Sequence, residues 1–197
     1  PDACEGTILL EQLMETIKQF SNVHQEAALR AALRTLLSQS HEQRKEVKPL
    51  LQELITEATY QTSSERLDWK SAIRLAAKPL LDSGQIEETY PEAMIAKVQE
   101  FGPFIDLGKG IAIPHARPEG GVNRVGMSML VLENPIYLLD DPKHEIRLLI
   151  CIAAVDNETH LKALSHLTTI LRDATNVNAL LASKSYSEIK NIIQQEA

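Results

Sequence analysis

The sequence lacks the short motifs that identify the common nucleotide-dependent and hydrolytic enzymes. Its 197 residues contain no GxGxxG or GxxxxGKS/T phosphate loop, no HExxH zinc-protease motif and no GxSxG nucleophile motif. A function that depends on one of these motifs is therefore not supported. Any chemistry has to come from another arrangement of residues.

Clustered positive charge and long apolar runs are also missing. The formal net charge is −7 at pH 7, whereas proteins that bind nucleic acid cluster Lys and Arg on one face. No apolar run approaches the roughly 18–20 residues of a membrane span, and no signal peptide is present. We therefore expect a cytoplasmic chain that contacts neither nucleic acid nor a membrane.

Cysteine is scarce, with Cys4 near the start of the chain and Cys151 inside an apolar run. The chain has no CxxC metal or redox pair, and we expect no disulfide between the two cysteines. Cys151 is best explained as a small residue of the hydrophobic core.

Residues 1–48 predict a helical hairpin and a linker. Apolar residues recur at helical spacing over 7–20 and again over 25–38, which indicates two amphipathic helices joined by a short turn. The polar run 39–46 is the best linker in the chain, so we expect residues 49–197 to form a separate domain. Because the chain begins without Met, we expect it to be a piece of a longer protein.

Residues 49–197 interleave strand and helix patterns, as in an α/β layered sheet. Asp68 is a candidate N-cap, and Gly84 a candidate left-handed stop, for the first helix. The run IRLLICIAA is apolar on both faces, so we expect it to be a central strand covered on both sides. Helices are expected over 68–83, 87–100, 157–172, 175–183 and 185–195, and strands over 58–62, 111–113, 124–132 and 146–154.

Two of the six histidines occupy unusual positions, and the first is His115. The apolar strand 111–113 runs into Pro114, which stops strand pairing and directs the chain out of the sheet. His115 then lies where a strand meets a loop, close to Arg117. A neutral imidazole is a good nucleophile near its pKa, and a guanidinium binds phosphate oxygens in pairs. A loop histidine with one structural hydrogen bond would explain the same pattern.

The second is His160, in the first turn of the helix expected over 157–172. Helical spacing places it on the face of Leu164, Leu167 and Leu171, which packs on the sheet. A histidine at the carboxyl end of a central strand, beside free helix amides, lies where an anion would bind. A core histidine hydrogen-bonded to a carbonyl explains the position equally well.

Two histidines also permit metal binding. A zinc site needs three or four ligands of defined spacing, and the nearby candidates are His144 and Cys151. Because Cys151 is expected to be buried within its strand, we expect no metal site. No dissociable cofactor is implied either.

The segment GIAIPHARPEGGV (110–122) resembles the active-site stretch of the mannitol/fructose/ascorbate-type enzyme IIA family of the sugar phosphotransferase system. The segment LLICIAAVDNETHLKALSHL (148–167) is similar to the family's strand and following helix, whose first turn carries a second histidine. The resemblance extends upstream to DWKSAIRLAAKPLLDSGQIEETYPEAMI (68–95). Two motifs in the right order, with a matching helix pair before them, make the resemblance specific.

This resemblance implies a mixed sheet covered by helices on both faces, with His115 as the phosphoryl acceptor and His160 as the histidine that assists it. Arg117 is a candidate phosphate-binding residue from its position alone. Mannitol-type members usually have glycine directly after this histidine, whereas this chain continues with ARPE (116–119), which looks more like the ascorbate-type branch. The implied partners are the histidine phosphocarrier protein and a IIB domain or protein.

The expected hairpin in residues 1–48 looks like the connection into the C-terminal IIA-like domain of PRD-containing, mannitol-operon-type transcription regulators. We therefore favour a regulatory domain that is phosphorylated on His115 and signals to upstream domains of the same chain, rather than a turnover enzyme. The second hypothesis is a IIA carrier that passes phosphate to a IIB cysteine during sugar uptake. The third is an interaction module in which the histidines are only structural.

Overall fold

The structure is a computed structural model that describes residues 51–194, apart from the side chains of Asn157 and Thr159. The helical hairpin expected over residues 1–48 lies outside the described residues. All the elements below belong to the unit Pro49–Ala197. Within residues 51–194, no helix is both long and apolar enough to cross a membrane.

Four strands form one mixed sheet in the order β1-β3-β4-β2. The central strands β3 (Gly126–Tyr137) and β4 (Glu145–Ala153) are antiparallel, while β1 (Tyr60–Ser63) pairs in parallel with β3 and β2 (Ile111–Ala112) pairs in parallel with β4. The carboxyl ends of β2 and β4 therefore meet at the same edge of the sheet. This edge carries the residues that follow each strand, including His115.

Strand β4 is central because its side chains are apolar on both faces. Leu149 and Cys151 belong to a hydrophobic core with α4 (Trp69–Asp82) and α5 (Thr89–Phe101). Leu148 and Ile150 belong to a second core on the other face of the sheet. The expected central strand, covered on both sides, is confirmed.

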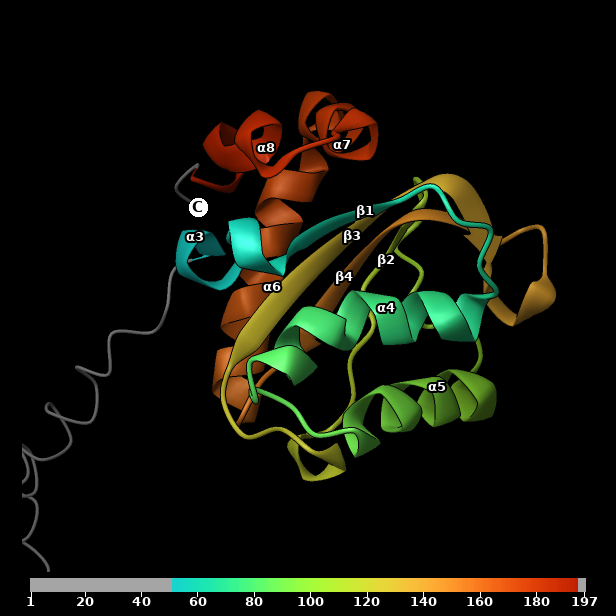
Figure 1. Cartoon of the computed structure of the whole chain (residues 1–197), viewed down its shortest axis with the longest axis vertical. Helices are drawn as coiled ribbons and strands as arrows, with labels where there is room; N and C mark the ends of the chain where they lie inside the picture. The colour runs from blue at the N-terminus through green and yellow to red at the C-terminus, as the bar shows by residue number, and fades with distance from the viewer. Residues whose placement is uncertain (1–50, 195–197) are drawn as a thin grey trace, which may run out of the picture. The chain divides into compact units, whose positions relative to one another are not determined.

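The helices form two layers around the sheet. Figure 1 shows α4 and α5 on one side of the strands and α6 on the other. The second core is built with the helices α3 (Leu51–Leu54), α6 (Asn157–Arg172), α7 (Ala174–Ala182) and α8 (Tyr186–Ile193). The short 3-10 turns are η1 (Glu57–Thr59), η2 (Pro118–Gly120) and η3 (Leu138–Asp140). The predicted mixed α/β sheet with helices on both faces is confirmed.

Helix α4 begins and ends as the sequence predicts. The carboxylate of Asp68 accepts hydrogen bonds from the amides of Lys70 and Ser71, and Gly84 has a φ of 70° just after the helix. Pro79 lies inside the helix and has no N–H to donate to the carbonyl four residues earlier. The side-chain amide of Gln61 on β1 donates to that carbonyl, Leu75 O, at 2.9 Å and compensates for the missing bond.

Strand β3 is longer than the expected 124–132. Pairing with β4 is irregular between Val131 and Ile136, and it resumes at Ile136 and Tyr137 opposite the start of β4. Pro135 cannot donate to the ladder, so the sequence around it resembles the end of a strand. The antiparallel partner continues past this point and extends the strand.

Candidate functional site

The structure brings His115 and His160 together from different elements. His115 follows β2 after Pro114, and His160 is the fourth residue of α6, directly after β4. Their ring centroids are 4.9 Å apart, with the ring planes at 47°. Each ring is partly buried, so the pair forms part of the surface at the carboxyl end of the central strands.

The loop around His115 is held against β4 by backbone groups and by one tyrosine. The amide of Ile152 donates to Pro114 O at 3.1 Å, which continues the contact with β4 beyond the end of β2. The hydroxyl of the fully buried Tyr90 donates to Ile152 O at 2.7 Å and accepts from the Ala116 amide at 3.1 Å. The residues on both sides of His115 are therefore fixed to the same strand.

One hydrogen bond determines the tautomer of His115. Its Nδ1 lies 2.8 Å from Ile113 O. Because a carbonyl oxygen only accepts, Nδ1 carries the proton and donates it. In the neutral ring, Nε2 then holds the lone pair and is the nucleophilic nitrogen.

Both imidazoles are held toward their neutral form. Burial lowers the pKa of His115 below its usual 6.5; the hydrogen bond to Ile113 opposes this shift, and the charge of Lys97 adds to it. Burial also lowers the pKa of His160, as do the neighbouring charges of His115 and Lys97. A neutral ring is required for attack on phosphorus, so these shifts favour a nucleophile near neutral pH.

Lys97 and Phe104 belong to the site, although the sequence analysis did not single them out. The Lys97 ammonium lies 5.2 Å from the centroid of the Phe104 ring. The centroids of the Phe104 and His115 rings are 5.4 Å apart, with the ring planes at 85°, an edge-to-face arrangement. On α5, Lys97 comes seven residues after Tyr90 and three after Met94, so it lies on the same face of the helix as these two buried side chains. A cation on the apolar face of a helix was the signal that could have identified it.

Arg117, the predicted phosphate-binding residue, is exposed just before η2. No side-chain hydrogen bond or ion pair joins it to other residues in the range 51–194. The cation whose charge reaches both imidazoles is Lys97. Arg117 remains a candidate because its side chain is available to an incoming group.

The residues considered for metal binding are not gathered at the histidine pair. Cys151 is fully buried next to Met94, and burial raises the pKa of its thiol to about 12. His144 Nδ1 instead lies 2.7 Å from Asp106 Oδ2. In the described part of the chain, no three or more His, Cys, Asp and Glu side chains form a group that could hold a metal ion.

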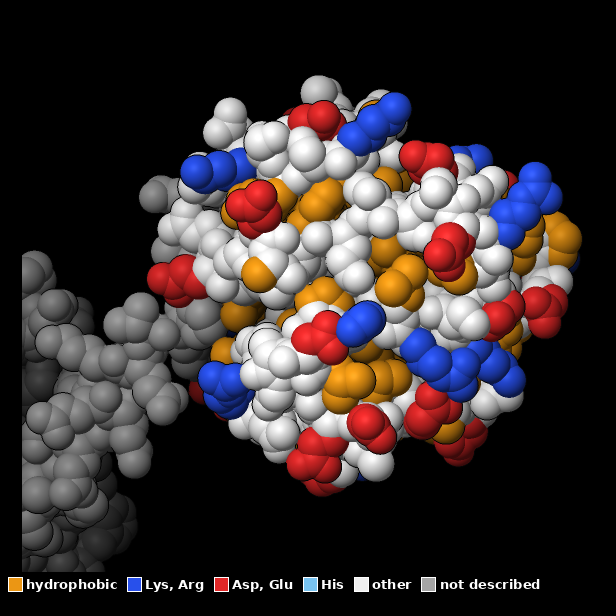
Figure 2. Space-filling model, viewed as in Figure 1, with side chains coloured by type: hydrophobic (Ala, Val, Ile, Leu, Met, Phe, Trp, Pro, Cys, Tyr) orange, Lys and Arg blue, Asp and Glu red, His pale blue; other side chains and the backbone are white. Residues whose placement is uncertain are grey.

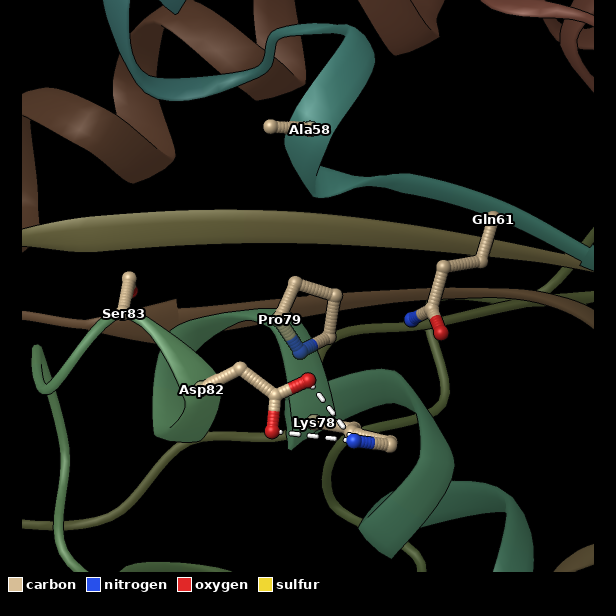
Figure 3. A pocket seen from close by; sticks show the side chains of 6 residues that line it. All are labelled: Ala58, Gln61, Lys78, Pro79, Asp82 and Ser83. Atoms are coloured by element: carbon tan, nitrogen blue, oxygen red, sulfur yellow. Dashed lines mark hydrogen bonds and ion pairs between the residues drawn. The ribbon is translucent and has the colours of Figure 1, made fainter.

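A separate pocket of about 410 Å³ opens between β1 and α4. Figure 3 shows Lys78 and Asp82 facing each other there, with Gln61 reaching in from β1. Lys78 Nζ lies 2.7 and 2.9 Å from the two carboxylate oxygens of Asp82, so this pair satisfies itself. The residues that line the pocket do not include either site histidine.

The charged residues do not form a basic surface on the face shown in Figure 2. Lys and Arg side chains are scattered there among Asp and Glu side chains. A nucleic-acid interface would need the positive charges gathered along one groove or stripe. The distribution on this face of the described residues gives no support for such an interface.

Comparisons with known proteins agree on one family. Residues 53–196 match the family described as "Phosphoenolpyruvate-dependent sugar phosphotransferase system, EIIA 2". The "Ascorbate-specific PTS system EIIA component" of Escherichia coli (strain K12) is 29% identical over 133 residues, which cover 67% of this chain and 86% of that protein.

Two solved structures from Escherichia coli share the fold. The solution structure of the mannitol-specific cryptic phosphotransferase enzyme IIA matches with a TM-score of 0.67 and 32% identity, covering 74% of this chain and 98% of that one. Mannitol enzyme IIA, solved in complex with phosphorylated mannitol enzyme IIB, matches with a TM-score of 0.63 and 25% identity, covering 71% of this chain and 98% of that one.

Proposed function

Because this chain belongs to the EIIA 2 family of the phosphoenolpyruvate-dependent sugar phosphotransferase system, we propose that it accepts and passes on a phosphoryl group at Nε2 of His115. The observation that carries the assignment is the hydrogen bond from His115 Nδ1 to Ile113 O at 2.8 Å, which leaves Nε2 with the lone pair. The proposed reaction takes place in the cytoplasm.

In the proposed step, the Nε2 lone pair of His115 attacks the phosphorus of a phosphohistidine on the donor protein, in line with the bond that breaks. A new P–N bond forms at His115, and the electron pair of the old P–N bond returns to the donor imidazole. The Nδ1 proton stays on the His115 ring, which gains positive charge. The Ile113 carbonyl already accepts from Nδ1 and stabilises that charge.

Lys97 and His160 act on the transferring group. The Lys97 ammonium is close enough to both rings to lower their pKa values, so it is also positioned to attract phosphoryl oxygens. The His160 ring, 4.9 Å from His115, provides a donor on another side of the same group. Arg117 is proposed as a further, more mobile contact from the exposed loop.

The surroundings of the site suit a protein as donor and acceptor. Phe101 and Leu161, which lie on the helices that carry Lys97 and His160, are 64% and 65% exposed. Exposed apolar side chains around a reactive group indicate a docking surface. The proposed partners are the histidine phosphocarrier protein and a IIB domain, the latter by analogy with the enzyme IIA–IIB complex of mannitol.

Two settings for this chemistry are proposed. The amphipathic patterns over 7–20 and 25–38, outside the family match, favour the regulatory domain of a PRD-containing transcription activator or antiterminator, in which the charge on His115 acts on upstream domains. The sugar-specific carriers among the relatives favour transfer to a IIB cysteine instead. Replacing His115 in the full-length protein with non-phosphorylatable and phosphate-mimicking residues separates them, because only the regulatory setting requires different transcriptional outputs.

The acceptor itself is tested by His115→Ala. We expect the variant to take up no acid-labile phosphate from the phosphorylated histidine phosphocarrier, because its nucleophile is gone. His166→Ala, which removes a histidine from α6 outside the site, is the matched control and should still be phosphorylated. Intact-protein mass spectrometry reports both results, and undiminished phosphate on His115→Ala would refute the assignment.

A further inference from the structure

Phe104 contacts both His115 and Lys97, so the position of its ring matters to the site. The centroid of its ring lies 5.4 Å from the centroid of the His115 ring and 5.2 Å from the Lys97 ammonium. Phe104 is nonetheless 38% exposed and lies on the connection between α5 and β2, not in a helix or strand. Its position therefore depends on what holds that connection in place.

Phe104 and Ile105 are the central residues of a four-residue turn. The amide of Asp106 closes this turn by donating to Pro103 O at 3.0 Å. At the other end, the chain enters through Gly102, whose φ of 82° belongs to the region that favours glycine. Asp106 is thus the polar residue that ends the turn carrying Phe104.

Both carboxylate oxygens of Asp106 are used. Oδ1 accepts from the Gly108 amide at 2.7 Å, and Oδ2 accepts from His144 Nδ1 at 2.7 Å. The Asp106 side chain is only 14% exposed, so these bonds replace most of its contact with water. Its partner His144 lies in the turn between β3 and β4, where its carbonyl accepts from the Leu138 amide at 3.0 Å.

We infer that Asp106 and His144 form a positioning pair that holds Phe104 against His115 and Lys97 and thereby sets the rate of phosphoryl transfer. The pair connects the β3–β4 turn to the turn that carries Phe104. Because the Phe104 ring packs against His115, fixing this turn also restricts the position of the His115 ring. Neither Asp106 nor His144 touches the transferring group. The inference rests on the proposed function for its effect on rate, but not for its effect on the position of Phe104.

The test is a double-mutant cycle between Asp106→Asn and Phe104→Leu. We expect each single variant to slow phosphorylation of His115 by about tenfold, less than the roughly hundredfold that a 1 Å misplacement of reacting groups can cost. The melting temperature of each variant is measured in parallel. If the pair acts through Phe104, the double variant is no slower than Phe104→Leu alone. His144→Gln approaches the same bond from the other side and should reproduce the effect of Asp106→Asn.

Asp82→Asn is the matched control, because it removes a carboxylate with an equally short bond, to Lys78, in the pocket of Figure 3. It should leave the transfer rate unchanged. Two results would overturn the inference: wild-type rates for both Asp106→Asn and His144→Gln, or a double variant in which the two effects multiply.

A second measurement separates this inference from the proposed function. In the unphosphorylated protein, NMR signals of the His115 ring protons report the ring current of Phe104. In Asp106→Asn they should move toward their positions in Phe104→Leu, and they should stay in place in Asp82→Asn. If wild-type protein accepts no phosphate, the proposed function fails, while unmoved signals in Asp106→Asn refute the positioning pair itself.

Discussion

A lysine lies near the histidine pair and another lines the pocket beside β1, but Lys97 and Lys78 have different surroundings. In the pocket, Lys78 lies against both oxygens of Asp82, which neutralises its charge locally. Lys97 lies over the ring of Phe104, its charge lowers the pKa of both imidazoles, and it forms no ion pair with any of the described residues. A lysine without its own carboxylate can bind an incoming phosphoryl group, whereas Lys78 would first have to lose Asp82.

The comparison also shows that the presence of a pocket in this protein does not by itself indicate a functional site. The pocket has a volume of about 410 Å³, yet the amide of Gln61 is already bonded to Leu75 O and its lysine is already paired. The histidine pair lies instead among exposed apolar side chains such as Phe104. A group that is exchanged between proteins needs a reactive surface more than a deep cavity.

Of the changes that compare the histidine pair with the pocket beside β1, His160→Ala is expected to have the largest effect on the rate of phosphoryl transfer. Loss of one preorganised donor slows a reaction of this kind by roughly 10²–10³-fold, so phosphorylation of His115 should slow by that factor while His115 is still modified. Gln61→Ala, the corresponding change in the pocket, should transfer at the wild-type rate. Rapid-quench time courses compare the two, and an unchanged rate in His160→Ala would make His160 structural only.

A smaller effect is expected when each lysine is replaced by methionine. Lys97→Met should lower the transfer rate by about tenfold to hundredfold, the range of one lost charge-assisted hydrogen bond. Lys78→Met should leave the rate unchanged, because Lys78 is already paired with Asp82 and lines a pocket beside β1, at the opposite edge of the sheet from β2. The comparison between the lysines fails if both variants slow transfer equally.

The pH dependence of transfer provides a finer comparison. Burial lowers the pKa of His115 from 6.5, so more than half of the His115 rings should still be neutral at pH 6.5, and the midpoint of the decline in rate should lie below that pH. Lys97→Met removes a nearby positive charge, raises the pKa of His115 and should move the decline to higher pH. Lys78→Met should not move it, and stopped-flow or quenched-flow rates from pH 5 to 8 measure the difference.

The same lowered pKa values affect stability, with a sign that follows from proton binding. The two imidazoles have ordinary pKa values near 6.5 in the unfolded chain, so they bind more protons there than in the folded chain as the pH falls from about 6.5 toward their lower folded pKa values. The free energy of unfolding should therefore decrease over that range of pH. Chemical denaturation at several pH values, with His115→Ala as the control, tests this contribution.

The smallest effect is expected from Asp82→Asn. Exposed ion pairs contribute about 0–1 kcal/mol, so the free energy of unfolding should change by no more than that amount, and the transfer rate should not change. Urea denaturation is the measurement. A loss of several kcal/mol would mean that the pocket pair is a structural element comparable to the core.

Much of the fold was predictable because its cues are local. Asp68 caps α4 through bonds within one turn, and the apolar run of β4 by itself indicates a strand buried on both faces. The extension of β3 past Pro135 was missed because it depends on β4 as a partner. Local sequence does not contain that information.

The make-up of the candidate site was predictable in part for the same reason. His115 and His160 were each proposed from the strand that precedes them, and the structure places their rings 4.9 Å apart. Lys97 and Phe104 carry no motif, and their relation to His115 exists only after α5 and its following turn have packed. For Arg117 the sequence indicated an available cation but not where its side chain lies.

The hydroxyl of Tyr90 has a consequence for the order of events in folding. It joins α5 to Ile152 on β4 across 62 positions of the chain, and it also holds the amide that follows His115. Contacts between such distant segments form late, because closing a long loop costs entropy before any bond compensates for it. Because β4 and α6 follow His115 in the chain, His115 is also synthesised before they can organise its surroundings. We expect an unfinished chain to be a poor phosphoryl acceptor, so that phosphorylation is confined to molecules that have completed their fold.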